Sequence, residues 1–230
     1  MCAVIGSILR SPSRKDFDAL SRVFIESKIR GMHATGLAYI KNGDVHIIKK
    51  SVPADEFPFD FPSYLNEDGN LYLIGHCRYS TSDLEYNQPI GNESHAIVHN
   101  GVITQELPEN WEKKYGYKTV TKNDSELVQH SNDPLSEFSH MSMAVCEITA
   151  CTKELTIYRN GKRPLYLTSM ANGAIITSTA DIANRAGLYL PNMEVPMNTY
   201  ITFDSNLTMK LDAVKIKDSV DYQNYEDSRN

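Results

Sequence analysis

The sequence predicts an α+β fold in which two antiparallel sheets pack face to face and helices lie outside them. Many short apolar runs are separated by turn residues, and pairs such as Asn42-Gly43 and Asn172-Gly173 are typical of β-hairpins. Few segments have the apolar spacing of a helix. Those segments follow the first strand and the pair Asn123-Asp124, and this placement favours a layered arrangement over a plain β-sandwich.

The first half of the chain alternates strands with a few helical segments. Ser13 and Asp16 have the spacing of a capping box, so a helix begins there, and Gly31 is expected to end it. A weaker helix is expected at 107–115, and another begins at Asn123-Asp124. The pair Asn100-Gly101 is expected to interrupt the last of the strands. The predicted strands of this half are 2–9, 35–41, 45–50, 71–78 and 95–99.

The second half consists mainly of hairpins. A short helix at 180–186 is expected to stop at Gly187. We expect a single domain over residues 2–217, followed by an acidic, flexible tail over residues 218–230. The predicted strands are 141–148, 155–158, 165–169, 174–178, 199–203 and 208–216.

Composition and charge exclude several classes of protein. A hydrophobic content of 41% and a charged content of 23% are ordinary for a globular domain of 230 residues. The net charge of −6 argues against a nucleic-acid surface, and no apolar stretch is long enough for a membrane span. The N-terminus lacks the pattern of a signal peptide, and the four cysteines have no C-x-x-C spacing. We therefore expect reduced thiols and a cytoplasmic location, without membrane or nucleic-acid partners.

Cys2 directly follows Met1 and begins the first apolar run. Removal of Met1 would leave one residue that carries both a thiol and a free α-amine. These two groups have similar proton affinities near neutral pH, so the amine can accept the thiol proton, and one residue can be both nucleophile and base. The alternative is a buried structural cysteine, because free cysteine is among the most buried residue types.

Other residues could take part in such chemistry. Arg78 ends a predicted strand, where its guanidinium could hold a carboxylate or form a plain surface ion pair. Asn100 and Gly101 offer an amide side chain and an unobstructed N–H for an oxyanion hole, or form a simple hairpin turn. Asp124 could accept hydrogen bonds from a substrate ammonium group or cap a helix, and both roles can coexist.

Two further groups of polar residues support weaker hypotheses. His95 and His99 have the spacing of helical metal ligands, but the β-branched residues between them predict a strand, where they lie too far apart for one ion. We therefore expect no metal site. The basic turn at 158–165 is as compatible with solvated surface as with a site, and His33 is expected to be structural.

Taken in order, these segments resemble the class II glutamine amidotransferase domain of the N-terminal-nucleophile hydrolases. This domain occurs in amidophosphoribosyltransferase, glucosamine-6-phosphate synthase, asparagine synthetase and glutamate synthase. Each segment is weak alone, and their order makes the set specific. The matching segments, over most of residues 2–190, are Cys2 to Gly6, Arg30 to Gly36, Gly75 to Thr81, His99 to Gly101, Asp124 to Glu126, Arg163 to Leu165 and Thr177 to Ala180.

The resemblance implies a four-layer αββα sandwich and a site that hydrolyses the side-chain amide of glutamine through a thioester on Cys2. The Asn100 side chain and the Gly101 N–H would form the oxyanion hole. Arg78 would hold the α-carboxylate of glutamine, and Asp124 its α-ammonium group. The residues that the resemblance implies as further pocket lining are Tyr79, Ser80 and Thr81.

The resemblance also implies the ligands and partners. L-glutamine is the expected substrate, and no cofactor is implied. Residues 191–230 are too few for a second catalytic domain, so we expect an ammonia-accepting synthase subunit in trans. Ala3 stands where the family usually has glycine, and Tyr79 and Ser82 stand where glucosamine-6-phosphate synthase has Trp and His. These departures leave the pocket in question, but not the reaction class.

Two alternatives stay open. The chain could be a γ-glutamyl amidohydrolase that acts on larger glutamyl compounds without ammonia transfer. It could also be a catalytically silent scaffold or binding subunit, for which persistence of Met1 in functional protein would be the sign. The choloylglycine and penicillin-type amidases also begin with Met-Cys, but they lack the series Arg78, Asn100-Gly101 and Asp124.

Overall fold

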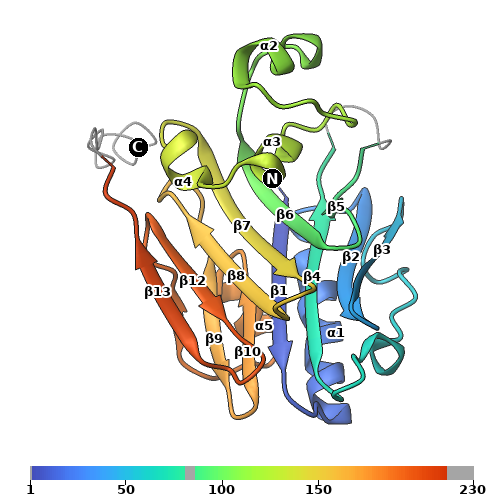
Figure 1. Ribbon diagram of the computed structural model, residues 1–230. Coiled ribbons are helices and arrows are strands. Elements are labelled where there is room, and N and C mark those ends of the chain that lie inside the picture. The colour runs from blue at the N-terminus through green and yellow to red at the C-terminus, as the bar shows by residue number, and fades with distance from the viewer. Residues whose placement is uncertain (1, 81–85, 217–230) are drawn as a thin grey trace, which may run out of the picture.

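The computed structural model of the chain describes residues 2–80 and 86–216. Two antiparallel sheets face each other, and helices lie on their outer faces (Figure 1). The first sheet has seven strands in the order β11-β9-β10-β1-β4-β2-β3, and the second has six in the order β13-β12-β8-β7-β6-β5.

The elements have the following bounds. The strands are β1 (Ala3–Leu9), β2 (Ala34–Lys41), β3 (Asp44–Lys50), β4 (Leu71–Arg78), β5 (Ile90–Gly91), β6 (His95–Val102), β7 (Ser142–Thr149), β8 (Glu154–Arg159), β9 (Tyr166–Met170), β10 (Gly173–Thr177), β11 (Asn192–Glu194), β12 (Thr199–Phe203) and β13 (Met209–Ala213). The helices are α1 (Arg14–Ser27), α2 (Trp111–Tyr115), α3 (Ser125–His130), α4 (Pro134–Glu137) and α5 (Ala180–Arg185), with 3₁₀ turns η1 (Phe61–Tyr64) and η2 (Pro108–Asn110).

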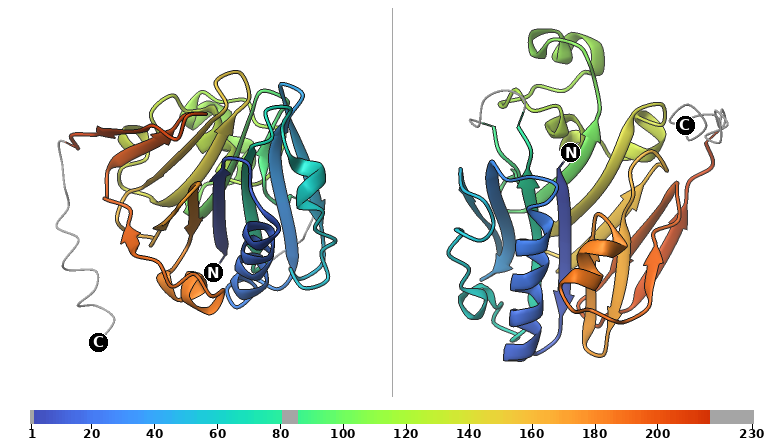
Figure 2. Two further views of the ribbon diagram at one scale, coloured as in Figure 1. Left: turned by 90° about the horizontal axis from the view of Figure 1, so that it is seen from below. Right: turned by 180° about the vertical axis from the view of Figure 1, so that it is seen from behind.

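Buried apolar clusters separate the layers. One cluster fills the space between the two sheets and includes Val4 and Cys146. A second joins α1 and α5 to the outer face of the first sheet, as Figure 2 shows from behind. A third packs α3 and α4 against the second sheet and includes Leu127 and Tyr158. The layers therefore follow the order helix, sheet, sheet, helix, which confirms the predicted αββα sandwich.

The central strand β1 explains why the chain begins with an apolar run. It pairs with β4 on one side and β10 on the other, and every residue from Ala3 to Leu9 is buried. Successive side chains point to opposite faces, so Val4 and Ile8 face the second sheet while Ile5 and Leu9 face the helices. A strand buried on both faces has no polar face to show in its sequence.

Three of the predicted caps and turns are present. The Ser13–Asp16 capping box is present, and Asn42 (φ 55°) and Gly43 (φ 81°) form the tight hairpin turn between β2 and β3. Gly187 (φ 82°) follows the end of α5 as predicted.

Other predicted boundaries were wrong. Helix α1 ends at Ser27, and Gly31 is needed for a different reason, because a Cβ atom there would overlap the carbonyl of Cys77. The pair Asn100-Gly101 does not interrupt a strand, because β6 continues to Val102 with β7 as its partner. The short strands β5 and β11 were not predicted, because pairing with neighbouring strands defines them. The turn η1 and the helix α4 were also missed, although the Asp133 side chain caps α4 and Pro134 begins it. None of the helices in the described ranges combines the length and apolar character that crossing a bilayer requires.

Candidate active site

Cys2 directly precedes the central strand β1, and β1 begins at the end of the sandwich where α2 and α3 are found (Figure 1). The β1–β4 register pairs Ala3 with Cys77, and its continuation sets Cys2 opposite Arg78. By the alternation of β1, Cys2 belongs to the face that carries Val4 and points toward the second sheet. The Cys2 thiol is half-buried, and its Sγ lies 3.9 Å from the Tyr79 carbonyl oxygen.

Arg30 approaches the same residue from the segment after α1. Its Nε donates a hydrogen bond to the Cys2 carbonyl over 3.0 Å. Burial and the nearby Arg163 guanidinium lower the pKa of Arg30 from its ordinary value. Arg30 therefore lies against the Cys2 backbone with Arg163 near it, although the sequence motifs gave neither a catalytic role.

Arg78 ends β4 with its side chain on the inward face, because Ile74 and Tyr72 in the same strand belong to the cluster between the sheets. Its Nη1 donates to Asn87 Oδ1 over 2.8 Å. Among the described residues, Arg78 is thus held by a neutral amide and not by a carboxylate. The interpretation as a plain surface ion pair has no support in the contacts of the described residues.

Asn100 lies on the inward face of β6, because Ala96 and Val98 in the same strand also face the first sheet. Its side chain is only 4% exposed, and its Nδ2 has no hydrogen-bond partner among the described residues. Buried amide N–H groups without partners are rare in proteins, and each needs an explanation. An oxygen atom of a bound ligand would supply the missing acceptor.

Gly101 follows on the same strand with an N–H that points away from β7. The N–H and the carbonyl of its cross-strand neighbour Met143 both bond Asn160, at 3.2 and 3.3 Å, so Gly101 and Met143 do not bond each other. A Cβ atom at position 101 would overlap the Ser142 carbonyl and the His99 ring. Only glycine therefore fits here.

A buried hydrogen-bond network holds the end of β6 and was missed in the sequence. The Gln88 side chain accepts from the His99 N–H over 2.6 Å and donates to the His99 carbonyl over 3.0 Å, as a neighbouring strand would. Ser125 Oγ, at the start of α3, lies 2.8 Å from His99 Nδ1 and 3.0 Å from Gln88 Nε2. Burial lowers the pKa of His99, an effect that Asp124 opposes. The network fixes the strand position next to Asn100 without adding charge.

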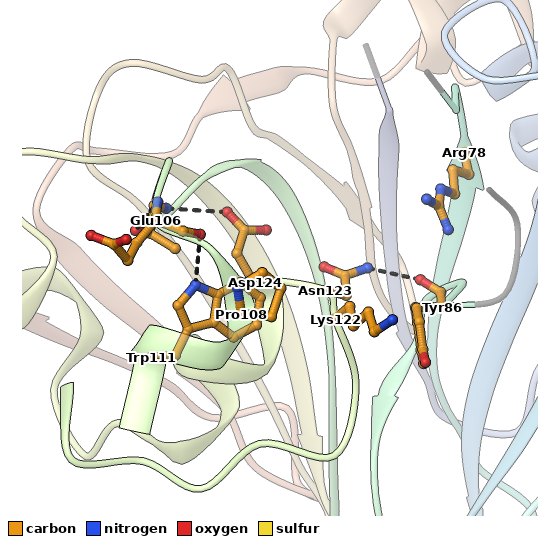
Figure 3. Close-up of a pocket in the computed structure, with 9 residues that line it drawn as sticks. Arg78, Tyr86, Glu106, Pro108, Trp111, Lys122, Asn123 and Asp124 are labelled. Carbon is orange, nitrogen blue, oxygen red and sulfur yellow. Dashed lines mark hydrogen bonds between the residues drawn. The ribbon is translucent and has the colours of Figure 1, made fainter. Parts of the chain in front are cut away.

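Arg78 and Asp124 line one polar cavity of about 350 Å³. Figure 3 shows Arg78 on the side of β4 and Asp124 on the side of α2 and α3, with Asn123 and Lys122 between them. A cation and an anion at opposite ends of one cavity match the charges of a free α-amino acid. The residues that line the cavity are Arg78, Tyr86, Thr104, Glu106, Pro108, Trp111, Lys122, Asn123 and Asp124.

Asp124 is held in place by the backbone. Its Oδ2 accepts from the N–H groups of Ile103 and Thr104 over 2.6 and 3.3 Å. It occupies the N-cap position of α3 but makes no capping hydrogen bond, so the predicted cap role is wrong for its side chain. Asn123 instead accepts from the Ser125 N–H over 3.1 Å.

The remaining predicted site residues are those expected to line the pocket, and only two of them lie within the described residues. Tyr79 is 52% exposed and its ring packs on His33, while the Ser80 N–H donates to His33 Nδ1 over 2.8 Å. His33 thus contacts both residues, and its structural role stays a prediction. Thr81, like Ser82, lies outside the described residues.

Cys2, Asn100 and Gly101 are not among the described residues that line the Arg78–Asp124 cavity. Arg78 connects the two parts, because it lines the cavity and lies opposite Cys2 in the sheet register. The structure thus brings the predicted residues to one end of the sandwich, in two adjoining groups.

The histidines considered as metal ligands have other neighbours. His95 Nε2 lies 3.7 Å from Glu147 Oε2, far along β6 from the Ser125 contact of His99. Within residues 2–80 and 86–216, no group of three or more His, Cys, Asp or Glu side chains could hold a metal ion.

The sequence matches no protein-family model and no curated protein. By structure, the chain is similar to glutamine phosphoribosylpyrophosphate amidotransferase from B. subtilis complexed with ADP and GMP, with a TM-score of 0.66 and 20% identity over 92% of this chain and 49% of that chain. It is also similar to a structure described as the allosteric regulatory enzyme of purine biosynthesis, with a TM-score of 0.65 and 20% identity over 94% of this chain and 50% of that chain. The chain spans about half the length of these neighbours and shares their fold, which confirms the predicted fold class.

Proposed function

We propose that this chain hydrolyses the side-chain amide of glutamine with Cys2 as the nucleophile, once Met1 has been removed. The observation that supports this most is the convergence of Cys2, Arg78 and Asn100 on the inward faces of two different sheets at one end of the sandwich. Three residues far apart in the sequence share this end. A purely structural set would not need a buried amide whose Nδ2 has no partner among the described residues at the same end of the sandwich as a half-buried thiol.

Substrate binding comes first in this proposal. Arg78 would hold the α-carboxylate and Asp124 the α-ammonium group across their common cavity. Asp124 is suited to this because backbone N–H groups already fix one of its oxygens. Clamping both charged groups would orient the side-chain amide before the chemical step, which is how positioned groups lower a barrier.

The chemical steps then follow from the groups around Cys2. The α-amine would take the thiol proton, and the sulfur would attack the amide carbon to form a tetrahedral intermediate. Asn100 Nδ2 and the Gly101 N–H would donate to the oxyanion. The protonated amine would pass its proton to the leaving nitrogen, releasing ammonia and leaving a γ-glutamyl thioester. Water would hydrolyse the thioester to glutamate and restore the thiol.

We further propose that the ammonia serves a separate acceptor enzyme, and that the chain works without a cofactor. The structural neighbour named as an amidotransferase is about twice as long as this chain, and the half that this chain does not match leaves room for such an acceptor. A γ-glutamyl amidohydrolase is the second candidate. Lys122 and Glu106 add charged groups to the cavity beyond the Arg78–Asp124 pair, and a substrate larger than glutamine could use them.

The proposal is tested by glutamate release from glutamine with wild-type protein, Cys2→Ala and Cys2→Ser. We expect activity only in the wild type, intact mass without Met1, and labelling of Cys2 by an electrophilic glutamine analogue. Equal activity of wild type and Cys2→Ala would refute it, and a working protein that keeps Met1 would favour the scaffold alternative. Faster turnover of a γ-glutamyl amine than of glutamine would select the second candidate.

A further inference from the structure

Strand β13 forms the outer edge of the second sheet (Figure 1). All five of its residues are exposed. One of its edges pairs with β12, and no strand of the described chain covers the other. An uncovered strand edge carries a row of backbone donors and acceptors that can pair with another strand.

The hydrogen bonds of the β12–β13 hairpin show which groups point outward. The Asp204 N–H donates to the Thr208 carbonyl over 3.2 Å, and the Val214 N–H donates to the Asn198 carbonyl over 2.8 Å. Even-numbered positions of β13 therefore bond β12. Backbone groups alternate along an antiparallel strand, so the N–H and carbonyl groups of Met209, Leu211 and Ala213 point away from the sheet.

A second copy of β13 fits these outward groups. If two copies run antiparallel with Leu211 opposite Leu211 of the second copy, then Met209 lies opposite Ala213 of the second copy. Each outward residue then meets an outward residue, and each such pair exchanges both of its backbone hydrogen bonds. The pairing is symmetric about a two-fold axis, as most homodimer interfaces are.

The side chains match in the same register. Lys210 lies opposite Asp212 of the second copy in a pair without backbone bonds, where opposing side chains are closest. Within one copy these two side chains already form an ion pair of 2.7 Å. On the inner face, Met209 and Leu211 continue the row of Ile201 and Phe203 beyond the core but are 46% and 50% exposed. A second copy would cover this apolar overhang.

We propose that the β13 edge binds a second copy of the chain, so that the six-stranded sheets of the two copies form one continuous sheet. A strand of five residues gives a small interface, so the dimer is weak and depends on concentration. The net charge of −6 on each copy opposes association, so the dimer needs salt near physiological strength to form. The edge is remote from Cys2 and the Arg78–Asp124 cavity, and the inference does not rest on the proposed function.

Charge reversal at the paired positions tests this register. Sedimentation velocity of the full chain from about 1 µM to about 1 mM, the range of weak association, should show a monomer–dimer equilibrium for the wild type. K210D and D212K should each weaken association at least about tenfold, because each sets like charges opposite each other. The double variant K210D/D212K should restore it, and a mixture of the two single variants should form a heterodimer.

Leu211→Pro provides a second test that leaves the hairpin bonds intact. The Leu211 N–H points outward, so proline removes only a donor that the dimer uses, and prolines of this kind are tolerated at sheet edges. We expect a monomer with an unfolding midpoint close to that of the wild type. A wild type that stays monomeric at every concentration, or a dimer that all charge variants keep, would overturn the proposal. So would dimerisation of residues 1–216 when the full chain is monomeric, because residues 217–230 would then be the natural occupant of this edge.

Discussion

Replacing Asn100 with alanine should remove most of the activity while leaving the stability of the fold nearly unchanged. The Asn100 side chain is buried, and its Nδ2 has no acceptor among the described residues. Such a group contributes little to folding, because it loses its hydrogen bonds to water and gains none in return. Its Nδ2 gains a hydrogen-bond acceptor only when the oxyanion of the reaction forms.

The expected loss of kcat is much larger than the expected change in the free energy of unfolding. Loss of one oxyanion donor typically lowers kcat by about 10²–10³, which corresponds to about 2.7–4 kcal/mol. An unsatisfied buried amide costs the native state about 1–3 kcal/mol, and its removal offsets the cavity that alanine leaves. We therefore expect the free energy of unfolding of Asn100→Ala to lie within about 1 kcal/mol of the wild type.

Asn160 is the matched control. It is buried like Asn100, but it accepts from the Met143 N–H over 3.2 Å and donates to the Met141 carbonyl. Asn160→Ala leaves both backbone groups unsatisfied and should lower the free energy of unfolding by at least about 2 kcal/mol. Glutamate release measures kcat, and urea denaturation followed by circular dichroism measures stability. The reasoning is refuted if Asn100→Ala unfolds as easily as Asn160→Ala while its remaining folded fraction keeps full kcat.

Three further predictions concern substrate binding, packing and pH. Asp124→Asn should raise the KM for glutamine at least about tenfold with little loss of stability, because the amide oxygen can still accept from the Ile103 N–H while the attraction to an ammonium group is lost. Gly101→Ala should lower the unfolding midpoint and the activity together, because its Cβ would overlap the Ser142 carbonyl and force β6 from β7. Burial lowers the pKa of His76 from 6.5 to about 3, so the unfolded chain binds the proton first as the pH falls. The stability contributed by neutral His76 is therefore complete above pH 6.5 and is lost toward pH 3, by about 1.4 kcal/mol per pH unit. Urea denaturation across this range should show that the free energy of unfolding falls more steeply with falling pH in the wild type than in His76→Leu.

Each of these has an outcome that contradicts it. An unchanged KM in Asp124→Asn would remove the ammonium-binding role from the cavity. A Gly101→Ala protein with wild-type stability would mean that the strand pair yields without cost. Parallel pH–stability curves for wild type and His76→Leu would show that His76 gains a proton in the folded state as easily as in the unfolded chain.

The catalytic candidates could be chosen from the sequence because their residue types limit what they can do. Cys2, Arg78 and Asp124 each fit one step of an amide hydrolysis, and their order along the chain resembles a known domain. The supporting residues could not be chosen in this way. Gln88 acts as a strand partner for His99, and Arg30 reaches the Cys2 carbonyl, through contacts that span 11 and 28 positions of the chain. No local pattern encodes such contacts.

The misjudged elements have the same cause. Asn-Gly is a strong turn signal, yet Asn100-Gly101 is extended because β7 pairs along the whole of β6. Glycine is needed at position 101 for another reason, since the position leaves no room for a Cβ atom. Asp124 is a good N-cap residue, but its carboxylate accepts hydrogen bonds from the N–H groups of Ile103 and Thr104 and not from the first turn of α3.

By itself, the sequence determined the alternation of strands, the hairpin turns and the chemical character of the candidate residues, because period, turn chemistry and side-chain type are local properties. Only the tertiary structure decided that Cys2 faces the second sheet and Asn100 the first, and that Arg78 and Asp124 line one cavity. It also decided that the outward backbone groups of β13 can pair with those of a second copy. Register and sheet packing set these relations. They depend on which strands meet, and that choice is made by burial of the whole core and not by any one segment.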